Sequence, residues 1–175
     1  MKRGIKMYQV GDFVVYGKSG VCKVEDVAAI DTSWNDSKKL YYTLQPVYHQ
    51  EKIFTPVDTA NFIRPVISDV EAKQLIADIP AISPEKIQMS DIRMWEGFYK
   101  RCIDTQECTN LLLMLKTVYL KKKQTEQIGK KFGQIDERFM SMAEDLLYGE
   151  FSVVLDMPKD SVKEYVGSYF ERNMQ

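Results

Sequence analysis

The hydrophobic pattern of the chain changes its period once, near residue 68, and does not change back. Before that point, runs rich in Val, Tyr, Thr and Ile stand at 13–16, 20–27, 40–48 and 51–57, as expected of β-strands. From Ser68 onward, apolar residues recur at the three- and four-residue spacing of one helix face. A single change of this kind indicates two modules, which we place at residues 1–66 and 67–175.

The β-rich part is too short to form a large sandwich. Turn residues separate its strands at 17–20 and 31–39. Four or five short strands in about 50 residues suit a small, strongly bent SH3-like or Tudor-like barrel. In the last of these runs, alternation predicts that Ile53 and Thr55 share one face and that Phe54 lies on the other.

Capping signals predict about five helices in the second part. Ser68 and Glu71 match a capping box that opens a helix toward Ile79. Ser90 is predicted to cap the next helix, which runs to about Asp104. Further helices are predicted at 109–126, from residue 134 and after Pro158. The predicted fold class is therefore α+β, a small β-barrel followed by an all-α domain.

Sequence motifs of enzyme chemistry are absent, since the chain contains no GxSxG, P-loop, HExxH or GxGxxG pattern. Its single histidine, His49, falls in a predicted turn without evident partners for base catalysis. Cys102 and Cys108 do not share a helix face, which disfavours a metal site. We expect no enzyme, cofactor, metal or small-molecule substrate. Three cysteines without CxxC spacing and the lack of a long apolar run indicate a cytoplasmic protein away from membranes.

The charges are unevenly distributed along the chain, although the net charge is only −1. Residues 85–131 carry 10 basic and 6 acidic side chains, whereas residues 132–175 carry 4 and 9. Any nucleic-acid contact is therefore expected in the middle segment, which contains DIRMWEGFYKRC at 91–102.

The opening YQVGDFVVYGKSGVCKVEDV, with Pro56-Val57 and Asn61-Phe62-Ile63-Arg64 after it, resembles the RNA-polymerase-interacting module of the CarD/CdnL family of bacterial transcription regulators. Transcription-repair coupling factors share that module but continue into helicase motifs, which this sequence lacks. The second half, with Trp95, Tyr99-Lys100 and IGKKFGQIDERFMSMAEDLLYGEFSVVL, is similar to the helical domain of CarD proteins.

The resemblance implies a mechanism with two contacts. The barrel would dock on the polymerase β subunit through an exposed strand edge, with Ile30, Thr32, Lys52 and Phe54 on that surface. The helical domain would meet promoter DNA weakly and non-specifically at the upstream edge of the bubble, where Trp95 acts as a wedge. The basic residues implied for DNA contact are Arg93, Lys100, Arg101, Lys121, Lys122, Lys123, Lys130 and Lys131. Many family members carry arginines where this chain has Gly97 and Phe98.

Two of these assignments have a plainer alternative. Spacing alone favours Trp95 as a core residue, because Trp95, Tyr99 and Cys102 share a helix face. With the resemblance added, we predict that Trp95 is exposed or half-exposed and that Tyr99 points inward. The run 121–123 either stays solvated at a helix C-terminus or forms a phosphate track with the lysines at 130 and 131.

Two functions from different classes are compatible with the sequence. The first is a regulator that binds polymerase and modulates open-complex stability. The second is a protein–protein adaptor that docks through its barrel and does not bind DNA. The nearly balanced charge keeps the second possibility open.

Overall fold

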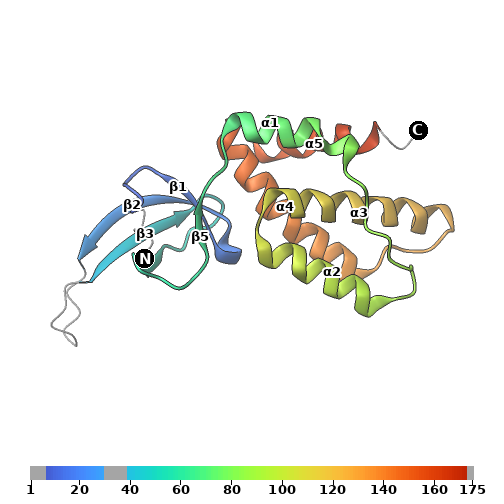
Figure 1. Cartoon of the computed structure of the whole chain (residues 1–175), viewed down its shortest axis with the longest axis horizontal. Helices are drawn as coiled ribbons and strands as arrows, with labels where there is room; N and C mark the ends of the chain where they lie inside the picture. The colour runs from blue at the N-terminus through green and yellow to red at the C-terminus, as the bar shows by residue number, and fades with distance from the viewer. Residues whose placement is uncertain (1–6, 30–38, 173–175) are drawn as a thin grey trace, which may run out of the picture. The chain divides into compact units, whose positions relative to one another are not determined.

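The computed structural model describes residues 7–29 and 39–172, and the chain divides into two compact units, Met1–Val66 and Ile67–Gln175 (Figure 1). The first unit contains a five-stranded antiparallel sheet, and the second contains five α-helices. The predicted α+β class is confirmed. Within the described ranges, no helix combines the length and apolar character needed to cross a membrane.

The sheet of the first unit is ordered β4-β3-β2-β1-β5, so β4 and β5 end the hydrogen-bonded array in the described part of the chain. Every neighbouring pair is antiparallel. The strands are β1 (Phe13–Tyr16), β2 (Val21–Ala29), β3 (Leu40–Pro46), β4 (Ile53–Pro56) and β5 (Ile63–Pro65). Strand β5 was not predicted, because its three residues carry too little alternation to recognise.

Two irregularities bend this sheet. Gly17 and Gly20 both have positive φ, and they allow the tight turn in which the Tyr16 N–H donates to the Gly20 carbonyl over 2.9 Å. In β2 the pairing with β3 shifts between Val24 and Asp26, which leaves Glu25 as the extra residue of a bulge. A bulge increases local twist, so a few short strands can wrap around one small core.

The core of the first unit lies on one face of the sheet. Its buried members are Val14, Cys22, Val24, Tyr42 and Leu44. The hydroxyl of Tyr42 is not left unsatisfied, because it accepts the Tyr8 backbone N–H over 3.0 Å. The predicted alternation in β4 is confirmed, since Thr55 is buried and Phe54 is exposed.

The five helices of the second unit begin close to the predicted positions. They are α1 (Asp69–Ala77), α2 (Ile92–Thr105), α3 (Cys108–Gln127), α4 (Gln134–Val154) and α5 (Lys159–Glu171). The capping box at Ser68 and Glu71 is present with both of its hydrogen bonds. The predicted cap at Ser90 is wrong by one residue, because Asp91 accepts the Met94 N–H and is the N-cap of α2. Ser and Asp are both good N-caps, so adjacent candidates cannot be separated by type alone.

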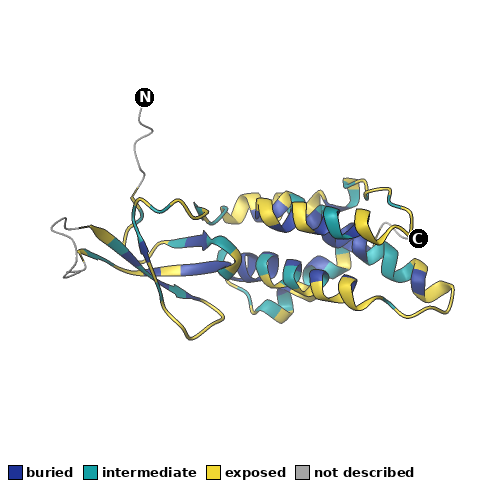
Figure 2. Ribbon diagram, turned by 90° about the horizontal axis from the view of Figure 1, so that it is seen from below, coloured by how far each residue is buried: buried dark blue, intermediate teal, exposed yellow. Residues whose placement is uncertain are grey.

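Helix α4 is central to the second unit, because it packs against α1, α2, α3 and α5. Buried positions line the facing sides of the helices and exposed positions line the outer sides (Figure 2). Glu150 of α4 is buried, and its carboxylate accepts the Ile67 backbone N–H over 3.0 Å and the Cys108 thiol over 3.3 Å. This central helix therefore holds both the first residue of the unit and the start of α3.

A second buried charge anchors the segment between α1 and α2. The Lys116 ammonium of α3 donates to the carbonyl oxygens of Ile79 and Pro80, over 2.7 and 3.0 Å. Burial lowers the pKa of Lys116. Farther along, the Glu85 N–H donates to the Thr117 hydroxyl over 3.1 Å. The segment at 79–88 is therefore tied to α3 at its start and at its middle.

We predict that the thiols of Cys22 and Cys102 react slowly with iodoacetamide in the native protein at pH 8. Both are buried, one in each unit, and desolvation raises the pKa of each to about 11 from 9.0. Because the folded-state pKa is raised, these groups favour the folded state below pH 9, and that contribution is lost as the pH rises through about 11.

Peptide-resolved mass spectrometry over an alkylation time course in increasing urea checks this prediction. Each cysteine should be modified only when its own unit opens, so the two sites report the stability of the two units separately. Rapid modification of either thiol without urea would contradict the described burial.

Candidate functional site

The first candidate surface is the outer edge of β4. Phe54 leaves 61% of its surface exposed, although it stands in the middle of a strand. Strand β4 is regularly paired with β3, with Thr55 opposite Tyr42 and Phe54 opposite Thr43. Among the described residues, β3 is the one strand bonded to β4. An edge strand of this kind can accept another strand.

The register shows which backbone groups of β4 face outward. The Val57 N–H donates to the Leu40 carbonyl over 3.0 Å, just beyond the strand pair. Antiparallel pairs alternate between hydrogen-bonded and non-hydrogen-bonded positions. Val57 therefore occupies a hydrogen-bonded position, and so does Thr55, two residues before it, whose backbone bonds toward β3. Phe54 occupies the position between them, so its N–H and C=O point away from β3. Pro56 also faces outward, where a missing N–H harms no existing bond.

Lys52 precedes this edge and is held by an ion pair. Its ammonium lies 2.7 Å from the Glu25 carboxylate of the β2 bulge, and both side chains remain partly exposed. A pair this exposed contributes little to stability but neutralises the charge of Lys52 locally. Ile30 and Thr32, the other two residues implied for polymerase contact, lie outside the described residues.

The predicted exposure of Trp95 is wrong. Trp95 is only 5% exposed, and Phe98 and Tyr99 beside it are also buried. Its Nε1–H donates to the Gln88 carbonyl over 3.0 Å, so the segment before α2 folds back across it. The spacing of apolar residues in α2 placed Trp95 at the rim of an apolar stripe. That spacing gives no information about the segment before α2, which covers the ring. The predicted inward position of Tyr99 is confirmed.

Lys121 covers one face of the Trp95 ring. Its ammonium lies 4.0 Å from the ring centroid, which is a close cation–π contact. The same ammonium donates to Asp136 Oδ1 over 2.7 Å, and the two side chains are each 11% exposed. Lys121 is therefore largely buried in the helical unit, so neither alternative for it, a solvated lysine or part of an exposed phosphate track, is correct.

Asp136 joins three helices at this point. Its Oδ1 also accepts the Tyr99 hydroxyl of α2, over 2.6 Å. Burial, followed by this hydrogen bond to the Asp136 carboxylate, raises the pKa of Tyr99, so the hydroxyl remains a donor. A Cβ on Gly133 would stand 2.9 Å from Asp136 Oδ2, so the glycine leaves room for the carboxylate. We name Trp95, Tyr99, Lys121 and Asp136 the indole clamp.

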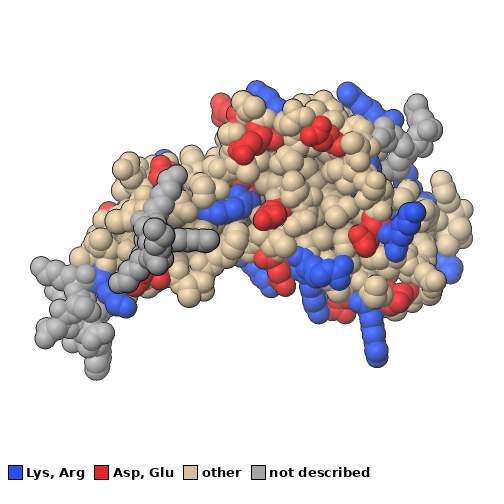
Figure 3. Space-filling model, in the orientation of Figure 1, with Lys and Arg blue, Asp and Glu red and all other residues tan. Residues whose placement is uncertain are grey.

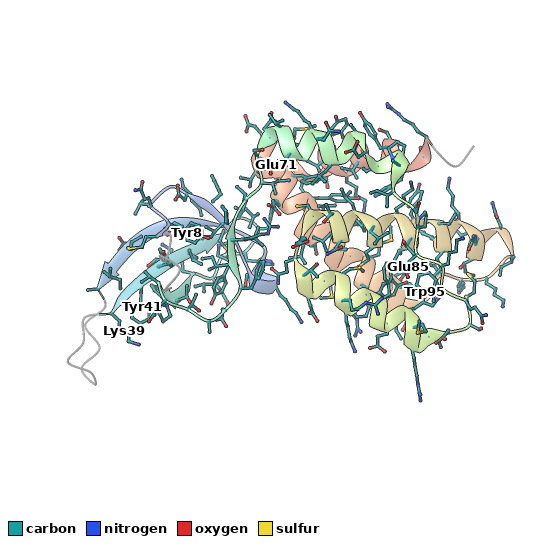
Figure 4. All side chains as sticks on the ribbon, in the orientation of Figure 1. Tyr8, Lys39, Tyr41, Glu71, Glu85 and Trp95 are labelled. Carbon is teal, nitrogen blue, oxygen red and sulfur yellow. The ribbon has the colours of Figure 1, made fainter. Side chains whose placement is uncertain are left out.

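Two hollows border the indole clamp. The first, of about 450 Å³, lies beside the segment before α2, and Glu85 and Trp95 both line it (Figure 4). The second, of about 370 Å³, lies between the starts of α2 and α4 and is lined by Ile92, Trp95, Lys121, Gly133, Gln134, Ile135 and Asp136. Trp95 and Lys121 border both hollows. We name the second one the α2–α4 hollow.

The structure separates the lysines that follow Lys121. Lys122 Nζ lies 5.7 Å from the Phe132 ring, and Lys123 Nζ lies 5.5 Å from the Tyr119 ring, so their stems cover different aromatic groups. Lys130 and Lys131 are exposed in the α3–α4 connection. A single track through all five lysines is not formed, because Lys121 turns inward.

Three more basic candidates lie on the outer side of α2. Arg93 and Arg101 are exposed, and Lys100 pairs with Glu96 over 2.9 Å. Lys and Arg side chains project from the lower edge of the helical unit, where Figure 1 places α2, with acidic side chains among them (Figure 3). This surface can meet an anionic partner, although acidic side chains lie among its basic ones.

We predict that Asp136→Asn lowers the free energy of unfolding of the helical unit by about 3 kcal/mol, because removal of one partner leaves a buried charge unpaired. Urea unfolding followed by helical circular dichroism measures the change. The double variant Asp136→Asn/Lys121→Met should recover part of the loss, because it removes the second charge as well.

Asp145→Asn is the matched control, because Asp145 on the same helix pairs with Lys159 over 2.6 Å and leaves 66% of its side chain exposed. Its effect should stay below about 1 kcal/mol. Equal losses in Asp136→Asn and Asp145→Asn would show that the indole clamp contributes no more to stability than an exposed ion pair.

Comparison with known proteins identifies the first unit. A search of curated proteins found no match to the chain. A family model described as the CarD-like/TRCF RID domain matches residues 8–67, which include all five strands. This match supports an RNA-polymerase-interacting, transcription-related protein. Residues 8–67 match the CarD-like/TRCF RID domain, and this match is consistent with a CarD-like family protein.

Proposed function

We propose that this chain is a non-enzymatic transcription regulator. In this proposal the RID domain docks on the β subunit of bacterial RNA polymerase through the β4 edge. The helical unit then contacts promoter DNA near the upstream edge of the bubble and changes the stability of the open complex. The observation that carries the proposal is the outward-facing backbone of Phe54 at an edge strand of a matched RID domain.

The chemistry of the β4 edge suits strand addition. An incoming strand would pair its backbone with the N–H and C=O of Phe54, and such bonds supply affinity without demanding a particular side chain. Exposed Phe54 can add apolar burial beside those bonds. The ion pair of Lys52 and Glu25 flanks the edge and limits the repulsion that a charged partner would meet.

The DNA contact in this proposal uses exposed basic residues and not the indole clamp. Arg93, Lys130 and Lys131 are exposed near the starts of α2 and α4. A few such contacts give weak, non-specific and salt-dependent binding. Docking on polymerase would raise the local concentration of the helical unit at the promoter, so weak intrinsic affinity suffices.

The adaptor remains the second candidate, because Lys121 is withdrawn from the surface and the remaining basic residues are interspersed with acidic ones. In that case the helical unit would bind a second protein. A measurable salt-dependent DNA affinity separates the two candidates.

We predict that Phe54→Asp in the full chain weakens binding to core polymerase by at least about tenfold, or about 1.4 kcal/mol. The new carboxylate would lie beside the outward-facing backbone of β4 and would have to be desolvated on docking. Biolayer interferometry with immobilised polymerase measures the change in affinity. The matched control is Val10→Asp, because Val10 lies outside β4 and is also 61% exposed.

The charge of Lys52 can be tested without breaking its ion pair. The swap Glu25→Lys/Lys52→Glu should keep the pair and the fold, and it moves the positive charge from the residue before β4 to β2. Weaker binding by the swap would assign a direct role to the Lys52 charge. If the swap and Phe54→Asp both bind polymerase with wild-type affinity, the docking surface does not include β4.

We predict that the DNA affinity of the chain falls steeply with salt, and that Lys130→Ala/Lys131→Ala reduces the log–log slope by about 0.9 for each phosphate that is no longer neutralised. Fluorescence anisotropy with a promoter-sized duplex measures the slope. Lys73→Ala is the control, since Lys73 is exposed on α1 and paired with Asp69 over 2.8 Å. Lys121→Met should leave the slope unchanged. A slope that falls with Lys121→Met and not with the double variant would overturn this assignment.

A further inference from the structure

We infer that Tyr16 is a positioning residue for the β4 edge, because its hydroxyl holds the edge strand where a partner strand can pair with it. This inference rests on the proposed function, since it names what keeps the proposed docking surface in position. Strand β4 has only four residues, and in the described part of the chain β3 is the one strand bonded to it. A strand bonded on one side has fewer hydrogen bonds to break than a central strand, so it opens more readily.

The Tyr16 hydroxyl reaches β4 from a distant strand of the sheet. In the order β4-β3-β2-β1-β5, two strands stand between β4 and β1, which carries Tyr16. The Tyr16 hydroxyl nevertheless donates to the Thr55 hydroxyl of β4 over 3.1 Å. In a flat sheet, strands three places apart are separated by about 14 Å, so this bond requires a strongly curved sheet. It gives β4 a second attachment in addition to its pairing with β3.

A third segment of the chain bonds to the same hydroxyl. The side-chain amide of Asn61, in the connection between β4 and β5, donates to the Tyr16 hydroxyl oxygen over 2.7 Å. The backbone of that connection is fixed beside it, because the Gly17 N–H donates to the Phe62 carbonyl over 2.9 Å. The Tyr16 hydroxyl is thus both a donor and an acceptor, and its orientation is set from two sides. Strand β4 is held at Thr55, and the chain that leaves β4 is held at Asn61.

The position of Thr55 determines the position of the outward-facing backbone next to it. Thr55 is buried, and its neighbour Phe54 points its N–H and C=O away from β3. Pro56, the other outward-facing residue of β4, has no N–H, so Phe54 is the residue of this strand that offers both a donor and an acceptor. Hydrogen bonds weaken steeply when their geometry is disturbed. With so few outward-facing groups, even a small shift of β4 would remove a large share of the pairing with a partner strand.

The first test is the affinity of Tyr16→Phe for immobilised core polymerase, measured with the full chain. This substitution removes the hydroxyl and keeps the ring. The affinity should fall by about fivefold, which is the equilibrium effect of one typical protein hydrogen bond. The matched control is Tyr42→Phe, because the Tyr42 hydroxyl lies in the same unit and accepts the Tyr8 N–H over 3.0 Å. Tyr42→Phe should keep the wild-type affinity.

Substitutions of Thr55 distinguish the hydrogen bond from packing. Thr55→Val keeps the shape of the side chain and removes the acceptor, so it should weaken polymerase binding as much as Tyr16→Phe does. Thr55→Ser keeps the acceptor and should retain most of the wild-type affinity. The double variant Tyr16→Phe/Thr55→Val should bind as each single variant does, because all three lack the same bond. Additive losses in the double variant would overturn the inference.

Amide hydrogen exchange in the free chain separates a failure of this inference from a failure of the proposed docking. Tyr16→Phe should speed exchange of the Val57 N–H, which bonds to β3 just after β4, by about fivefold, and it should leave the Val24 N–H of β2 unchanged. Unchanged exchange at Val57 would overturn the inference. Wild-type polymerase affinity in Tyr16→Phe would also overturn it if Phe54→Asp weakens binding. Wild-type affinity in both variants would overturn the docking surface itself, and Tyr16 would then hold β4 without a role in binding.

Discussion

The ion pair between Lys121 and Asp136 determines which side chains of the helical unit any partner can reach. Two charges at this depth would cost more free energy than they return if each had only the other as a partner. Asp136 also accepts the Tyr99 hydroxyl, and Lys121 also lies on the Trp95 ring, so both charges have a second interaction. The small residue Gly133 makes the arrangement possible, because a side chain there would displace the carboxylate. Helices α2, α3 and α4 are thus joined at one point, and Trp95 is held inside.

The sheet unit works under a different constraint. Its hydrogen-bonded array ends at β4 in the described part of the chain, and a strand edge must be protected, covered or used. The Pro56 ring and the charged pair of Lys52 and Glu25 limit unselective pairing at this edge. The backbone of Phe54 between them stays available for pairing. The same edge that would be a liability in an isolated sheet is therefore suited to pairing with a single partner strand.

Much of the fold could be predicted from the sequence, because it follows from hydrophobic periodicity, helix capping and strand alternation between residues close in sequence. The change of period near Ser68 marks the boundary between the two kinds of structure, and the capping box begins α1 where the pattern predicts. The alternation in β4 correctly placed Phe54 outside and Thr55 inside. The strand β5 could not be predicted, because three residues carry too little alternation and β1 pairs with it from far along the chain.

The candidate site was less predictable, because its critical contacts join distant segments. Trp95 is covered by Gln88 and by Lys121, which lies a helix away, and neither contact leaves a periodic signal. The run at 121–123 illustrates the same point, because three identical neighbours point to three different surroundings. One signal was available in retrospect. The pattern Gly133-Gln134-Ile135-Asp136 places a carboxylate in the first turn of α4, where it can fold back over a glycine.

A cryo-EM structure of the chain bound to RNA polymerase on an open promoter would test both contacts at once. We expect a β-subunit strand paired with β4 through the backbone of Phe54, promoter DNA against exposed basic residues of the helical unit, and Trp95 still beneath Lys121. A Trp95 ring released from Lys121 and inserted into the DNA would contradict a DNA contact that leaves the indole clamp intact. A polymerase contact that leaves the β4 edge unpaired would contradict the proposed docking surface.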